Sequence, residues 1–296
     1  MSKILVNRSK WLVVCLTLIP LWLALSAGVA VWWSLRDDDQ QERERNQRFA
    51  LEMSEQRISE DLRKLGEMVG ERHTGEQSSS KNLTRAAAMV EGVLGPSNTG
   101  YLIERIVAPM EWPIIRVSLP AKQANAPHLW VLTPYDSPRD QSTALADSAL
   151  AAAIAAAQTM AKDQAPCHIH FLFVPHGNEV EAPVRQTMER IQSLMKSPSA
   201  AFIIGPMGTS PQLLALSPNA ASSSTQALGD LGSHQWLASN LENLATTYRS
   251  MGIPALWVTS RREGVDNNTI EASHIAITAG KLVEWLRRCA RLEAVK

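Results

Sequence analysis

Polar and apolar positions divide the chain into an uncharged N-terminal run and a longer region of mixed pattern. Residues 11–33 contain no charged side chain, and tryptophans lie at both ends of this run, at Trp11 and at Trp32 and Trp33. A helix needs about 17–25 apolar residues to span a bilayer, and tryptophan is enriched at membrane interfaces. The pattern therefore predicts one transmembrane helix, which would act as a signal anchor.

The charges around this run predict its orientation. Basic residues precede it at Lys3, Arg8 and Lys10, and mixed, partly acidic sequence follows it. Positive charge favours the cytoplasmic side, so we expect a single-pass protein of the bacterial inner membrane with a periplasmic C-terminal region. A cleaved signal peptide is the alternative, because positions 27, 28 and 30 carry small residues. Both interpretations place the rest of the chain outside the cytoplasm.

Helix patterns and short strand patterns alternate along the rest of the chain. Apolar residues at helical spacing predict helices at 58–69, 83–94, 142–162, 182–196, 234–249 and 271–292. Strand patterns fall at 101–107, 114–119, 129–133, 167–174, 201–204, 213–216 and 254–259. Residues 218–232, rich in Ser, Ala and Asn, predict a loop. This alternation is typical of an α/β three-layer sandwich with a mixed, largely parallel central sheet.

Three regions follow from these patterns. We expect a cytoplasmic tip and membrane helix over residues 1–35 and a globular α/β domain over residues 55–296. The charged residues between them, 36–54, predict either a helical stalk or a flexible linker.

Composition narrows the range of functions. The chain has 29 basic and 29 acidic residues, so no overall positive field would attract nucleic acid. Its three cysteines form no Cys-x-x-Cys pair, which excludes a thiolate zinc knuckle. Export would permit a Cys167–Cys289 disulfide, but two small buried residues are the simpler interpretation. The sequence contains no nucleotide-binding glycine loop and no Gly-x-Ser-x-Gly motif.

Several short motifs follow one another in a recognisable order. Residues 71–75 read Glu-Arg-His-Thr-Gly, residues 128–137 lead a strand into Pro-Tyr-Asp-Ser, and residues 147–149 read Asp-Ser-Ala. Residues 171–179 lead a second strand into Gly-Asn-Glu, and residues 252–259 and 265–269 complete the series. In this order the motifs resemble those of the zinc exopeptidase family, which includes bacterial leucyl aminopeptidases and glutaminyl cyclases. The resemblance covers nearly all of residues 55–290 and implies a zinc aminopeptidase-like fold.

The resemblance also assigns the family's metal-site positions to this chain. Two zinc ions that share a water need a bridging carboxylate, further His and carboxylate ligands, and a glutamate base. Pro134 matches the first histidine, Asp136 the aspartate that orients it, and Asn178 the general base. The third-strand aspartate falls around Gly205, and the last histidine falls around Arg262. Pro134, Asn178, Gly205 and Arg262 cannot perform the corresponding tasks. Asp136 has no metal-linked task, because the histidine that it would orient is absent.

Two positions keep a residue that could bind metal. Asp147 matches the bridging aspartate and Glu179 matches another carboxylate ligand. Two carboxylates alone hold zinc weakly, so we expect relics, with no catalytic residue and no cofactor. The expected role is a binding, scaffold or regulatory subunit whose partners are other envelope or inner-membrane proteins, or a peptide ligand. An active zinc-dependent exopeptidase with relocated ligands is the alternative.

One further pattern could indicate a metal. His168 and His170 lie two residues apart on a predicted strand, so their side chains share one face. A His-x-His pair can bind a metal. We expect instead that these histidines form hydrogen bonds beneath a covering helix.

Overall fold

The computed structural model describes residues 16, 18–22, 25–33, 48–74, 76–108, 112–139, 142–178, 182–195, 201–217, 235–238, 244–250, 252, 255–261 and 269–293. The chain forms two compact units, Met1–Gln47 and Arg48–Lys296. The expected membrane segment lies partly outside the described residues, because positions 11–15, 17, 23 and 24 are not among them. Within the described residues, no helix combines the length and the hydropathy that crossing a membrane requires.

The first half of the second unit follows the sequence pattern closely. Its elements are α2 (Glu55–Arg63), the π-helix η1 (Lys64–Val69), α3 (Gln77–Leu94), β1 (Glu104–Val107), β2 (Pro113–Leu119), β3 (His128–Pro134) and α4 (Ala144–Met160). The polypeptide is attached to this unit before α2 begins, since the Phe49 N–H donates to the Thr99 carbonyl and the Leu51 N–H to the Gln158 carbonyl. The predicted helix over 58–69 is thus divided into an α-helix and a π-helix.

The second half contains one departure from the prediction. Its elements are β4 (His168–Val174), α5 (Ala182–Leu194), β5 (Ala201–Ile204), β6 (Leu214–Ser217), β7 (Gln235–Ala238), α7 (Leu244–Ser250), β8 (Ala255–Thr259) and α8 (Ala272–Glu293). The single helix predicted over 234–249 is wrong, because β7 occupies its first part and, of the residues described in this range, only those of α7 are helical. Strand β7 pairs in parallel with β6, a non-local contact that helical periodicity cannot reveal. The loop predicted over 218–232 lies outside the described residues.

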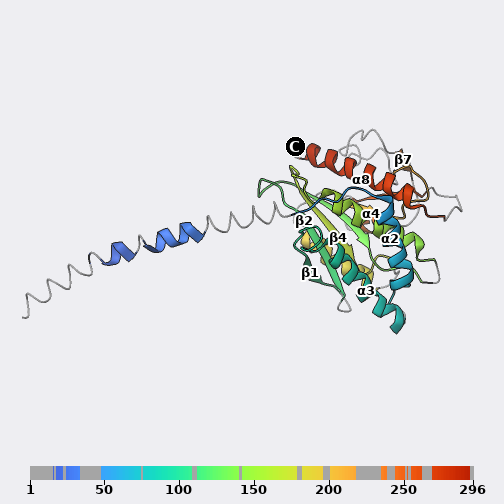
Figure 1. Cartoon of the computed structure of the whole chain (residues 1–296), viewed down its shortest axis with the longest axis horizontal. Coiled ribbons are helices and arrows are strands. Elements are labelled where there is room, and N and C mark those ends of the chain that lie inside the picture. The colour runs from blue at the N-terminus through green and yellow to red at the C-terminus, as the bar shows by residue number, and fades with distance from the viewer. Residues whose placement is uncertain are drawn as a thin grey trace, which may run out of the picture. The chain divides into compact units, whose positions relative to one another are not determined.

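These strands form one mixed sheet in the order β1-β2-β4-β3-β5-β8-β6-β7 (Figure 1). The pairs β3–β4, β3–β5, β5–β8 and β6–β7 are parallel. The pairs β1–β2, β2–β4 and β6–β8 are antiparallel. Four neighbouring strands, β4, β3, β5 and β8, therefore point in the same direction, and their carboxyl ends meet at one edge.

Helices cover both faces of the sheet, which confirms the α/β class. A large apolar cluster joins one face to α2, α3, α4 and α8, and a smaller cluster joins the other face to α5 and α7. Helix α8 packs along α4 in the first of these layers (Figure 1). Cys167 and Cys289 are buried thiols in the same cluster, as the simpler interpretation of the sequence requires.

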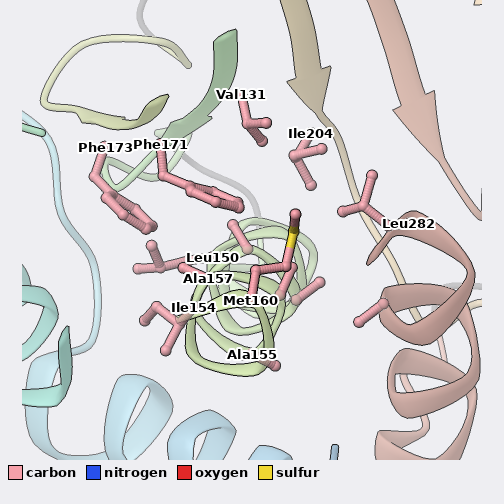
Figure 2. Close-up of a cluster of buried hydrophobic side chains, with 14 of the residues drawn as sticks. Val131, Leu150, Ile154, Ala155, Ala157, Met160, Phe171, Phe173, Ile204 and Leu282 are labelled. Carbon is pink, nitrogen blue, oxygen red and sulfur yellow. The ribbon is translucent and has the colours of Figure 1, made fainter. Parts of the chain in front are cut away.

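Helix α4 is the centre of the larger cluster. Nearly every residue from Ala146 to Met160 is buried, so the alanine-rich run is a core helix. Figure 2 shows Phe171 and Phe173 of β4 reaching from the sheet toward Leu150 and Ile154 of this helix. Small side chains let the helix approach the sheet and its neighbouring helices closely. This packing fixes the first turn of α4, which carries Asp147, at the carboxyl edge of the parallel strands.

Candidate functional site

The sequence-predicted site residues gather around the carboxyl ends of the parallel strands. Pro134 is the last residue of β3, and Asp136 follows directly. Asn178 lies beyond the end of β4, and Gly205 comes directly after β5. Ligand sites of open α/β sheets lie at this edge. These four positions, which the sequence analysis singled out, therefore meet at one edge of the sheet.

An ion pair occupies the position of the expected bridging carboxylate. Arg72 Nη2 lies 2.7 Å from Asp147 Oδ1, and both side chains are almost completely shielded from solvent. The Thr143 hydroxyl donates to Asp147 Oδ2 over 3.0 Å. Both carboxylate oxygens thus face a protein group. Burial raises the pKa of Asp147 above its ordinary value, while Arg72 and the Thr143 hydrogen bond act in the opposite direction.

Several backbone groups hold Arg72 in this position. Its Nε donates to the Tyr135 carbonyl over 2.7 Å, and its Nη1 donates to the Gly70 carbonyl over 2.9 Å. Its own backbone N–H donates to Ser137 Oγ, and its carbonyl accepts the Ser137 N–H. A guanidinium that is fully buried and directed by two carbonyls has a fixed orientation. Arg72 therefore presents its positive charge to Asp147 in one defined geometry.

Local structure explains how the chain brings Arg72 there. The π-helix η1 ends at Gly70, which has a positive φ of 74°, a conformation that glycine adopts readily. Asn82 of α3 donates to the carbonyl of Glu71 over 3.0 Å and holds the following segment. π-helical turns occur often at functional sites. Two residues after Gly70, Arg72 contacts Tyr135 and Ser137, which follow β3.

Asp136 performs a structural task at the same edge. Its carboxylate accepts the backbone N–H groups of Gly177 and Asn178 at 2.8–3.1 Å. The Asn178 side-chain amide donates to the Asp136 carbonyl over 2.9 Å. The two positions that match the orienting aspartate and the general base are therefore bonded to each other.

Two further positions are closely packed. A Cβ placed on Gly177 would lie 2.7 Å from Pro134 Cβ and nearer still to its Cγ. A Cβ placed on Gly205 would lie 2.7 Å from Trp257 Nε1 and nearer still to the indole ring carbons. The Trp257 ring thus fills the space that any side chain at position 205 would need.

Sequence analysis missed two of these residues. Arg72 lies within one of the quoted motifs, but nothing in the sequence pairs it with Asp147. Trp257 was predicted only to lie in a strand. Glu179 and Arg262 lie outside the described residues. Among the residues that are described, no three His, Cys, Asp or Glu side chains are placed to share a metal ion.

Comparisons with known proteins identify the fold. No family model and no curated relative matches the sequence. Among solved structures, the LapA aminopeptidase of Legionella pneumophila matches with a TM-score of 0.59 and 11% identity, over 80% of this chain and 72% of that one. A glutaminyl cyclase from an Acidobacteriales bacterium matches with a TM-score of 0.56 and 13% identity, over 82% of this chain and 96% of that one. A dinuclear metal binding peptidase of the M20 family from Bacillus subtilis matches with a TM-score of 0.56 and 12% identity, over 81% of this chain and 99% of that one.

These matches agree with the motif order in the sequence. At such low identity they establish the fold and leave activity undecided. The resemblance inferred from six short motifs is thus confirmed at the level of three-dimensional structure. The chain has the α/β fold of the zinc exopeptidases.

Proposed function

We propose that the chain is a membrane-anchored, exported binding or scaffold protein whose exopeptidase-like domain has lost zinc-dependent hydrolysis. The single observation that carries this proposal is the buried ion pair between Arg72 and Asp147. An arginine side chain keeps its positive charge in proteins. A zinc ion on the same carboxylate would face that charge at short range, where the low dielectric strengthens repulsion.

The neighbouring positions support the same conclusion. Proline offers no ligand at Pro134, and the Trp257 ring leaves no room for a carboxylate at position 205. Asp136 and Asn178 bind each other and the backbone of the loop after β4. The described residues therefore do not fit a pair of zinc ions, and no hydrolytic step is assigned to them.

A membrane anchor accounts for the N-terminal unit. The described residues between 16 and 33 are helical and exposed, and their large apolar members include Leu21, Trp22, Leu25 and Trp32. A helix that exposes leucine and tryptophan on all sides is suited to lipid. With basic residues before this helix, the domain would lie in the periplasm of a bacterial cell.

The partner class follows from this location and from the overall charge. A single-pass anchor concentrates the domain at the membrane, where other envelope or inner-membrane proteins are available as partners. A peptide ligand is the other occupant that the fold favours. The equal numbers of acidic and basic residues give no reason to expect nucleic acid.

Metal analysis tests the loss of hydrolysis. Protein incubated with zinc and then gel-filtered should retain no stoichiometric metal, and a chelator should leave its unfolding temperature unchanged, because no described site fits zinc. A zinc aminopeptidase treated in parallel is the control, and it should lose thermal stability on chelation. One or two zinc ions per chain, with cleavage of aminoacyl substrates, would establish the active peptidase instead.

Membrane extraction tests the anchor. The full chain should remain with the membrane pellet after alkaline carbonate washing, and its intact mass should include residues 1–35. A matched chain that begins at Arg48 and is exported by a cleavable signal should be released into the soluble fraction. A mature chain shortened near positions 27–30 would show that the segment is a removed signal peptide.

A further inference from the structure

Three histidines and a tryptophan form a continuous stack at the other end of the parallel strands. His128 and Trp130 of β3 stand beside His168 and His170 of β4 in parallel register. Ring centroids are 4.6 Å apart for His168–His128, 5.1 Å for His128–His170 and 4.2 Å for His170–Trp130, with interplanar angles of 12–26°. The sharing of one face by His168 and His170 was predicted from the sequence, whereas the stack was not.

Hydrogen bonds link this stack into one unit. His170 Nδ1 lies 2.8 Å from Ser118 Oγ, and His170 Nε2 lies 2.8 Å from His128 Nδ1. In the His128–His170 bond one nitrogen must be an acceptor, so the two rings cannot both be cationic. Burial lowers the pKa of His170 to about 3. Such a weak base cannot activate the Ser118 hydroxyl, so the chain of bonds is structural.

The outer ring of the stack holds the connection between β2 and β3. The Ala121 N–H donates to His168 Nδ1 over 3.1 Å, and His168 Nε2 lies 3.3 Å from the Ala124 carbonyl. Nδ1 must therefore be unprotonated, and Nε2 carries the proton. A second proton, placed on Nδ1, would remove the acceptor of the Ala121 N–H. The Ala121 end of residues 120–127 therefore depends on a neutral His168, whereas the other end is also held by the His168 backbone N–H, which donates to the Pro127 carbonyl over 2.8 Å.

The surroundings of the stack disfavour additional positive charge. Arg116 of β2 pairs with Glu104 of β1 beside the rings, and Lys122 lies in the connection itself. Neighbouring β5 contributes Ala201 opposite Trp130. Helix α5 faces this side of the sheet with Met188 and Ile191, while its charged residues Arg185, Glu189 and Arg190 are exposed. Among the described residues, Glu104 is thus the anion beside the stack, and Arg116 already pairs with it.

We propose that the stack of His128, His168, His170 and Trp130 is an acid-sensitive latch: in acid, protonation of His168 releases the Ala121 end of residues 120–127. The proton on His168 Nδ1 breaks the bond to the Ala121 N–H, and its charge repels Arg116 and the adjacent rings. The Arg72–Asp147 pair lies at the opposite end of the strands and plays no part in this step. An exported domain would meet such acid directly, but the latch itself does not require the proposed anchor.

The direction of the pH effect follows from the shifted groups. Burial lowers the pKa of His128, with His168 and Arg116 acting in the same direction, and burial also lowers the pKa of His170. The unfolded state therefore binds more protons than the folded state below about pH 6.5, the ordinary value for histidine. The contribution of these rings to stability is complete above that pH and is lost as the pH falls toward the folded-state values.

Amide hydrogen exchange of the full chain in detergent micelles tests the latch. The Ala121 amide is the direct reporter, because it donates to His168 Nδ1. Between pH 7.5 and pH 5.0, after correction for the intrinsic effect of pH, protection at residues 121–126 should fall by about tenfold or more. Amides of α4 should keep their protection over the same range.

Two variants separate the latch from a general loss of stability. His168→Asn places an amide oxygen near the position of Nδ1, where it accepts the Ala121 N–H without titrating. This variant should retain protection at pH 5.0, whereas His274→Asn, on α8, should behave like the original protein. The proposal is overturned if protection is unchanged at pH 5.0, if α4 loses protection to the same extent, or if His168→Asn still releases the segment.

Discussion

Replacing Arg72 with methionine should lower the free energy of unfolding of the 48–296 unit by about 3–5 kcal/mol, because it leaves the Asp147 carboxylate buried and unpaired. The pair is 2.7 Å apart with both side chains shielded from solvent, so water cannot compensate for the lost charge. Methionine keeps most of the side-chain volume, which limits the effect of a cavity. Urea unfolding followed by circular dichroism measures the change.

The pH dependence of this variant provides a second criterion. Burial already raises the pKa of Asp147 against the influence of Arg72, so removing Arg72 should raise the pKa further. A raised folded-state pKa gives stability that is present at low pH and is lost as the pH rises. The Arg72→Met variant should therefore recover part of its stability as the pH falls from 7 toward 5.

Two comparisons isolate the ion pair. The double variant Arg72→Met, Asp147→Leu should regain most of the lost stability, because apolar replacement of a buried pair is often tolerated. Arg63→Met, which removes an exposed i,i+4 pair with Glu67, should change stability by less than about 0.5 kcal/mol. A loss below about 1 kcal/mol for Arg72→Met would show that Asp147 does not need the guanidinium.

Much of the fold could be predicted from the sequence because its elements are strongly patterned. Strands β3 and β4 and helix α4 appear close to their predicted limits, since long apolar runs and an alanine-rich helix leave few alternatives. The prediction of one helix over 234–249 was wrong, because its first part is strand β7. That strand exists through its pairing with β6, which lies at a distance along the chain. Local periodicity carries no information about such a partner.

The candidate site, too, could be predicted only in part from the sequence. Pro134, Asp136 and Asn178 follow predicted strands in the sequence, and the structure brings them together beyond the ends of β3 and β4. The contacts of Arg72 and Trp257 were not predictable, since they form between residues distant in the sequence. Arg72 reaches Asp147 across a segment containing three strands, and Trp257 covers Gly205 from a neighbouring strand.

These contacts show how the chain itself partners the buried carboxylate of Asp147. A buried carboxylate requires a cation or several hydrogen-bond donors. In the proposed non-catalytic domain, Arg72 supplies the positive charge from within the chain, and Thr143 supplies a further donor. With Arg72 in place, Asp147 is therefore expected to stabilise the fold, because its loss would leave the guanidinium buried and unpaired. Its replacement by alanine should unfold the domain rather than test an inherited activity.

Placing a carboxylate at position 205, where the resemblance to zinc exopeptidases expects one, should be as damaging as removing the ion pair. A Gly205→Asp side chain would collide with the Trp257 indole, and overpacking alone costs about 1–3 kcal/mol. The backbone at this position is fixed, because the Gly205 N–H donates to the Val258 carbonyl over 2.7 Å. Burying the new carboxylate without a partner adds a further cost. We expect a total loss of about 3 kcal/mol or more in urea unfolding.

Removing the obstructing ring should restore stability if packing is the cause. The double variant Gly205→Asp, Trp257→Ala should be more stable than Gly205→Asp alone, although Trp257→Ala is itself destabilising. Gly280→Ala in α8 is the matched control, because a Cβ there meets nothing within 4 Å and alanine favours a helix by about 0.5–1 kcal/mol. If Gly205→Asp is as stable in urea unfolding as this control, the Trp257 indole does not exclude a side chain at position 205. Position 205 would then accept a carboxylate, and the argument against a metal centre would rest on Arg72, Pro134 and the Asp136–Asn178 contact.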